Sequence, residues 1–87
     1  MREEVRWFAE RMEEVLRGND HRSGWGNVEV LDLFWMLQDE VRELEAALWY
    51  GKGDVVKECC DVANFAMMIA DKEKNNEKIV DGGKEEV

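Results

Sequence analysis

Residues 55–72 read VVKECCDVANFAMMIADK, and this stretch decides the fold. Placed on a helix, it is apolar on nearly every side, and such a helix belongs in the middle of a bundle. Its apolar members are Cys59, Cys60, Val62, Ala63, Phe65, Ala66, Met67, Met68, Ile69 and Ala70. Asp54 can cap its first turn. The pattern therefore predicts a central helix from Val55 to about Lys72.

Two amphipathic helices are predicted before this one. The first runs from Arg2 to Arg17, where apolar residues recur at helical spacing before Gly18-Asn19. The second runs to about Tyr50 and can be capped by Asn27, with Gly51-Lys52-Gly53 as the following turn. Its strongest apolar stripe should face the core and comprises Val30, Phe34, Leu37, Val41, Leu44 and Leu48.

A second, weaker apolar stripe lies on roughly the opposite side of that helix. Its members are Val28, Leu31, Trp35, Ala46 and Trp49. This is more apolar surface than a monomeric helix usually leaves in water, so we interpret it as a subunit interface. A chain of 87 residues also has a marginal core when alone.

These elements predict an all-α fold, a helical bundle of about three helices per chain that is completed by oligomerisation. The absence of proline agrees with this class. We expect one helical domain over residues 1–74. Residues 75–87 are polar and contain a Gly-Gly pair, so they are predicted to form a mobile C-terminal tail.

The formal net charge of -9 argues against binding to nucleic acid backbones, which requires lysine and arginine to neutralise phosphates. No stretch is apolar and long enough for a membrane span, and MREEVR does not resemble a signal peptide. A cytoplasmic location is therefore expected. The adjacent Cys59 and Cys60 suit neither a disulfide framework nor a zinc site, and we interpret them as reduced core residues.

Two pairs of carboxylates indicate a metal-dependent catalytic site. Glu58 and Asp61 interrupt the apolar helix, and Glu40 and Glu43 have the same spacing on the helix before it. Residues three apart share a helix face, and antiparallel packing could bring both pairs together. Converging carboxylates require a cation, and oxygen ligands suit Mg²⁺ or Mn²⁺. Such a cation can polarise phosphorus and activate water, which is phosphoanhydride hydrolysis. Either pair alone is also compatible with a solvated helix face.

The combined pattern is Asp39-Glu40-x-x-Glu43, fourteen residues, then Glu58-x-x-Asp61. It resembles the E-E-x-x-E … E-x-x-D signature of the MazG-like, all-α nucleoside triphosphate pyrophosphohydrolases. The resemblance covers roughly residues 25–71 and departs at Asp39, where the family often has glutamate.

The resemblance implies magnesium-dependent cleavage of a (d)NTP to (d)NMP and pyrophosphate, in nucleotide-pool house-cleaning by a homodimer or homotetramer. Glu40, Glu43, Glu58 and Asp61 would then hold the metal. A carboxylate such as Asp39 or Glu40 would assist the attacking water.

Several further side chains are candidates for contacting substrate. Aromatic faces can stack on a base, and basic or amide groups can reach phosphate or orient a ligand. These candidates are His21, Arg22, Trp25, Tyr50, Asn64, Lys72 and Lys74. For the lysines, a favourable charge at a helix end is the alternative explanation.

Two rival functions remain open. The first is a phosphoribosyl-ATP pyrophosphatase, because the resemblance implies that these enzymes share the helical bundle and have a similar carboxylate pattern. A noncatalytic helical module that binds a protein partner through its tryptophan stripe is the other rival. In that case magnesium would change nothing.

Overall fold

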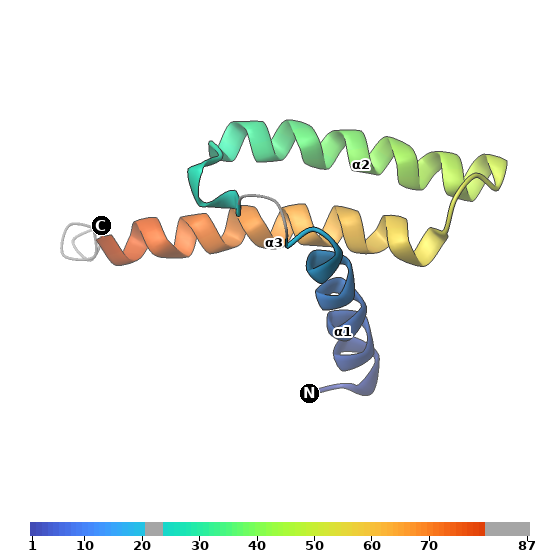
Figure 1. Ribbon diagram of the computed structural model, residues 1–87, viewed down its shortest axis with the longest axis horizontal. Coiled ribbons are helices and arrows are strands. Elements are labelled where there is room, and N and C mark those ends of the chain that lie inside the picture. The colour runs from blue at the N-terminus through green and yellow to red at the C-terminus, as the bar shows by residue number, and fades with distance from the viewer. Residues whose placement is uncertain (21–23, 80–87) are drawn as a thin grey trace.

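The computed structural model describes residues 1–20 and 24–79, with side chains as far as Asn76, and this part of the chain is all helical (Figure 1). Helix α1 spans Glu3–Gly18, and a short 3-10 helix, η1, spans Trp25–Asn27. Helix α2 spans Val30–Tyr50 and helix α3 spans Val55–Ile79. The described residues contain no strand, so the predicted all-α class is confirmed.

Helices α2 and α3 form an antiparallel hairpin, as Figure 1 shows. Gly51 ends α2 in the left-handed conformation, with φ of 66°, which glycine adopts without strain. The Asp54 carboxylate then accepts hydrogen bonds from the backbone N–H groups of Val56 and Lys57, at 3.0 and 3.3 Å. The predicted glycine turn and the predicted Asp54 cap are both confirmed.

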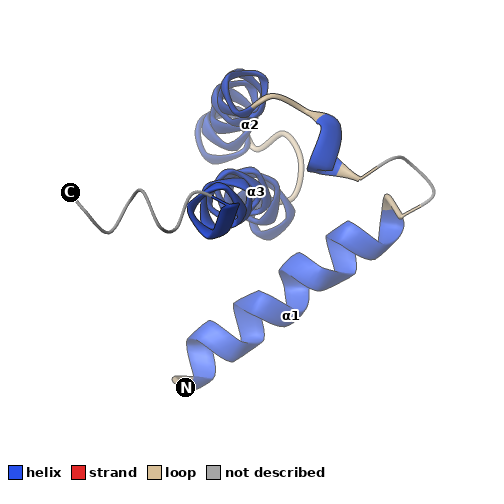
Figure 2. Ribbon diagram, turned by 90° about the vertical axis from the view of Figure 1, so that its left-hand side faces the viewer, coloured by secondary structure: helices blue, strands red, loops and turns tan. Residues whose placement is uncertain are grey.

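Helix α3 is the central element, because both other helices pack on it. Helix α2 runs along one side and α1 crosses the other side obliquely (Figure 2). The Asn64 side chain ties α3 to α1 by donating a hydrogen bond to the backbone carbonyl of Met12, at 3.2 Å. Cys60 is fully buried in this packing, as its interpretation as a reduced core residue requires.

Two predicted helix boundaries are wrong. Asn27 does not cap α2, because it lies in η1 and the helix begins after Glu29, which makes no side-chain capping bond. Helix α3 continues past Lys72 to Ile79, since this segment contains no proline or glycine to stop it. Residues 80–87 of the predicted tail lie outside the described residues. None of the described helices is long and apolar enough to span a membrane.

The predicted core stripe of α2 is also wrong in its most exposed members. Phe34, Val41 and Leu48 are 40 %, 47 % and 64 % exposed. The residues that α2 buries are instead Leu33 and Ala47. They belong to the strip that also carries Glu40, because positions seven apart recur on one helix face. Helix α2 therefore turns the side of Glu40 toward α3. Within its strongest apolar stripe Val30, Leu37 and Leu44 are half-buried, whereas Phe34, Val41 and Leu48 are exposed.

Candidate metal centre

Three carboxylates meet between α2 and α3. One oxygen each from Glu40, Glu43 and Glu58 lies within 4.8 Å of the others. Glu40 and Glu43 come from adjacent turns of α2, and Glu58 comes from the first turn of α3, across the antiparallel hairpin. The structure therefore brings together three of the four residues that were predicted to bind metal.

Glu58 is the carboxylate whose burial is hardest to explain by folding alone. It is only 9 % exposed, and its Oε1 atom is buried with no hydrogen-bond partner in the described part of the chain. Gly53 in the preceding turn leaves space for it, since an added Cβ would lie 3.3 Å from Oε2 of Glu58. A buried carboxylate oxygen is costly unless a donor or a cation satisfies it, so Glu58 is a candidate ligand for a cation.

The electrostatics of the cluster show the same deficit of positive charge. Burial, followed by the charges of Glu43, Asp61 and Glu58, raises the pKa of Glu40 from 4.5 to about 7. The pKa of Glu58 is raised as well, chiefly by burial. Both carboxyls therefore hold protons more tightly in the folded protein than in the unfolded chain, because burial and the neighbouring carboxylates disfavour their charged forms.

The raised pKa of Glu40 predicts how the stability of the metal-free protein depends on pH. Between about pH 4.5 and 7 the folded state binds more protons than the unfolded chain, so the free energy of unfolding falls as the pH rises through this window. Melting curves in chelator from pH 5 to 8 measure this slope. Glu40→Gln should flatten it, and a wild-type stability that increases across the window would contradict the assignment.

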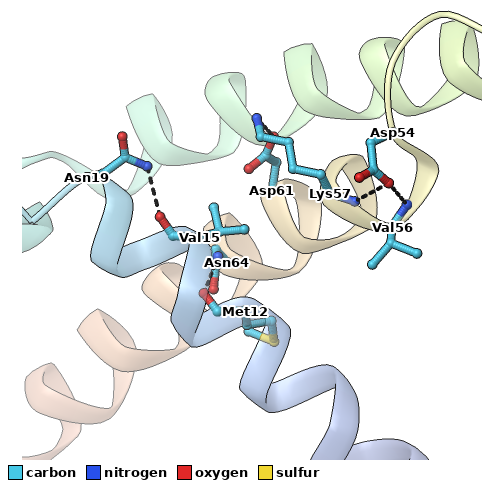
Figure 3. Close-up of polar contacts among 8 residues, drawn as sticks. All are labelled: Met12, Val15, Asn19, Asp54, Val56, Lys57, Asp61 and Asn64. Carbon is cyan, nitrogen blue, oxygen red and sulfur yellow. Dashed lines mark hydrogen bonds and ion pairs between the residues drawn. The ribbon is translucent and has the colours of Figure 1, made fainter.

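Asp61 lies beside the cluster and is engaged elsewhere. One of its oxygens accepts a hydrogen bond from Nζ of Lys57 at 2.9 Å, within the same helix. Figure 3 shows the Lys57 side chain extending along α3 to this carboxylate. Asp61 is still close enough for its charge to raise the pKa of Glu40.

Asp39 is separate from the cluster. Its carboxylate is exposed on α2 and accepts a 2.7 Å hydrogen bond from Arg42. Of the two carboxylates predicted to assist the attacking water, the structure therefore places Glu40 among the converging oxygens and Asp39 outside them.

A cavity of about 280 Å³ lies close to the cluster. Leu33 and Met36 line it from α2, and Met36 is one turn before Glu40. Its full lining comprises Leu16, Asn19, Asp20, Gly24, Trp25, Val28, Leu33, Met36, Phe65 and Met68. Most of these residues were not predicted as site residues. The placement of Leu33 and Met36 on the strip of Glu40 was the available signal.

Trp25 is the predicted substrate residue that lines this cavity. Its indole N–H donates a 3.1 Å hydrogen bond to Asp71, and Lys72 donates a 2.8 Å bond to the carbonyl of Gly26. Both bonds fasten η1 to α3. Lys72 is therefore engaged with the backbone of η1, and it is not among the residues that line this cavity.

The other predicted substrate residues are dispersed. Asn64 is buried and turned toward α1, although its Oδ1 atom has no partner. Tyr50 is exposed at the end of α2, and Lys74 is an exposed partner of Asp71 at 3.7 Å. His21 and Arg22 lie outside the described residues.

The donor set fits a hard divalent cation. Carboxylate oxygens are the ligands that Mg²⁺ and Mn²⁺ prefer, and the described cluster offers no thiolate or imidazole that would favour zinc. The orphaned oxygen of Glu58 provides the independent sign that a ligand is needed there. Glu40, Glu43 and Glu58 could hold the ion, with Asp61 as an adjacent fourth carboxylate.

Comparisons of the chain with protein-family models, with curated proteins and with solved structures find no match.

Proposed function

We propose that this protein is a magnesium-dependent nucleoside triphosphate pyrophosphohydrolase that cleaves (d)NTP to (d)NMP and pyrophosphate. The observation that carries the proposal is the convergence of Glu40, Glu43 and Glu58, with an oxygen of Glu58 buried and unpartnered. The MazG-like resemblance of the two carboxylate pairs supports it and suggests a role in nucleotide-pool house-cleaning.

The carboxylates provide the residues that the reaction requires. A bound Mg²⁺ supplies charge that neutralises phosphate oxygens and activates water. Glu40, Glu43 and Glu58 would hold it, with Asp61 as a fourth ligand. Of the two carboxylates expected to assist the attacking water, Glu40 lies among the converging oxygens, so it is the one that would accept the proton.

The neighbouring cavity suits the base of the nucleotide. It is lined mainly by apolar side chains, with Asn19, Asp20 and Trp25 as polar or amphipathic members. Pockets of this composition bind planar ligands by apolar contact and select them by a few hydrogen bonds. Because Met36 and Glu40 are on adjacent turns, a base in the cavity would direct its phosphates toward the carboxylates.

Trp25→Ala is expected to raise the KM for the nucleotide by about tenfold, because stacking on an aromatic side chain contributes about 1–3 kcal/mol per base. Trp25→Phe keeps an aromatic ring and loses the hydrogen bond to Asp71, so it should retain most of the affinity. Steady-state kinetics of both variants distinguish the two roles. Equal losses would assign Trp25 to fastening η1 rather than to stacking.

The protein is further proposed to act as a homodimer or homotetramer. Several large apolar residues of α2 remain exposed in a single chain, and six of them are here called the outer face: Leu31, Phe34, Trp35, Val41, Leu48 and Trp49. Three of them come from the predicted interface stripe and three from the stripe that was predicted to be core. A second copy would remove this surface from water and complete the bundle.

The reaction is tested by resolving products from a panel of standard and modified NTPs and dNTPs, with magnesium and with chelator. Monophosphate and pyrophosphate that form only with the metal are the expected products. Diphosphate and orthophosphate would contradict cleavage between the α and β phosphates. Activity on phosphoribosyl-ATP alone would favour a phosphoribosyl-ATP pyrophosphatase. Absence of product from every substrate, together with no effect of magnesium, would favour the noncatalytic module.

A further inference from the structure

Lys57 occupies an unusual position for a lysine. It lies in the first turn of α3, where the helix dipole disfavours a positive charge. Its partner Asp61 is four residues later, and this order of a basic and an acidic residue is the weaker one on a helix. Local helix energetics therefore do not explain why the pair forms.

The carboxylate cluster does explain it. The Nζ atom of Lys57 lies 2.9 Å from an oxygen of Asp61, and Lys57 directly precedes Glu58, one of the three converging glutamates. The lysine is thus a cation that the described structure places at the edge of the carboxylate cluster. It supplies part of the positive charge that the converging carboxylates require.

The same contact keeps Asp61 out of the group of converging oxygens. One Asp61 oxygen is bound to Nζ of Lys57 at 2.9 Å, and the three oxygens within 4.8 Å of one another come from the glutamates alone. The lysine side chain is 56 % exposed and that of Asp61 is 15 % exposed. Lys57 can therefore move into water easily, whereas the Asp61 side chain is mostly buried.

We propose that Lys57 is a built-in counter-ion of the metal-free site, and that a divalent cation binds by taking Asp61 from it. This inference rests on the proposed metal centre, and it assigns the control of metal binding there to Lys57. Metal affinity is lowered by the cost of breaking the Lys57–Asp61 pair, so the site fills only when free magnesium is abundant. Lys57 is a positioning residue here, because it acts through Asp61.

The test measures binding of Mg²⁺ alone by calorimetry, with Mn²⁺ titrations followed by electron paramagnetic resonance. Lys57→Gln is expected to tighten binding by about fivefold, the effect of removing a partly exposed ion pair. Lys57→Arg should bind like wild type, because it keeps the charge and the pair. Lys74→Gln is the matched control, since it removes a lysine of α3 that pairs with Asp71 away from the carboxylates.

A double-mutant cycle separates the exchange of Asp61 from simple charge repulsion. The effect of Lys57→Gln should largely disappear in an Asp61→Asn background. Undiminished tightening in that background, or unchanged or weaker binding in Lys57→Gln alone, would overturn the inference and leave the metal centre standing. Absence of binding to the wild-type protein would instead remove the metal centre itself and this inference with it.

Discussion

Glu58→Gln is expected to abolish magnesium-dependent turnover, with a loss of at least about 100-fold in kcat/KM. Glu58 is the most buried member of the cluster, and one of its oxygens has no hydrogen-bond partner among the described residues. Glutamine keeps the size of the side chain but offers a cation only a neutral oxygen. The same variant should also lose the rise in melting temperature that magnesium gives the wild-type protein by binding only its folded state.

The metal-free stability of this variant separates loss of a ligand from loss of the fold. Its melting temperature in chelator should equal or exceed that of wild type, because the pKa of Glu58 is raised by burial and the charged form is therefore disfavoured there. Glu45→Gln removes the same charge from an exposed position on α2 and should change neither property. Wild-type turnover by Glu58→Gln would remove Glu58 from the site.

Trp35→Glu is expected to dissociate the oligomer, raising its dissociation constant by at least about 100-fold. Trp35 lies on the outer face of α2, and in a symmetric pair each copy would bury a charge with no partner. Sedimentation velocity at micromolar concentration measures the change.

Asn75→Glu is the matched control for this substitution, since it adds the same charge at an exposed position of α3. It should sediment like wild type. A wild-type protein that is already monomeric at this concentration would contradict the assignment of the outer face as a subunit interface.

The sequence allows the helices and their turn to be predicted because these depend on local chemistry. Gly51 reverses the chain, and Asp54 caps α3 through its own carboxylate. The side of α2 that packs on α3 could not be predicted in the same way. The helix carries apolar residues on more than one side, so the periodicity alone does not determine which side packs on α3.

The candidate site was only partly predictable for a related reason. The spacing of Glu40, Glu43 and Glu58 predicted a shared location, and the three do converge. The hydrogen bond from Lys57 to Asp61 depends on the conformation that the long lysine side chain adopts among the charges of the whole cluster. The cavity beside Met36 required segments from α1, η1, α2 and α3 to be placed together, which no local pattern specifies.

The most direct test of the metal centre is anomalous diffraction from crystals grown with Mn²⁺ and a nonhydrolysable nucleoside triphosphate. The account predicts a manganese peak among the oxygens of Glu40, Glu43 and Glu58, with Asp61 released from Lys57 and the triphosphate on the same ion. A nucleotide bound elsewhere, with no peak between these carboxylates, would contradict it.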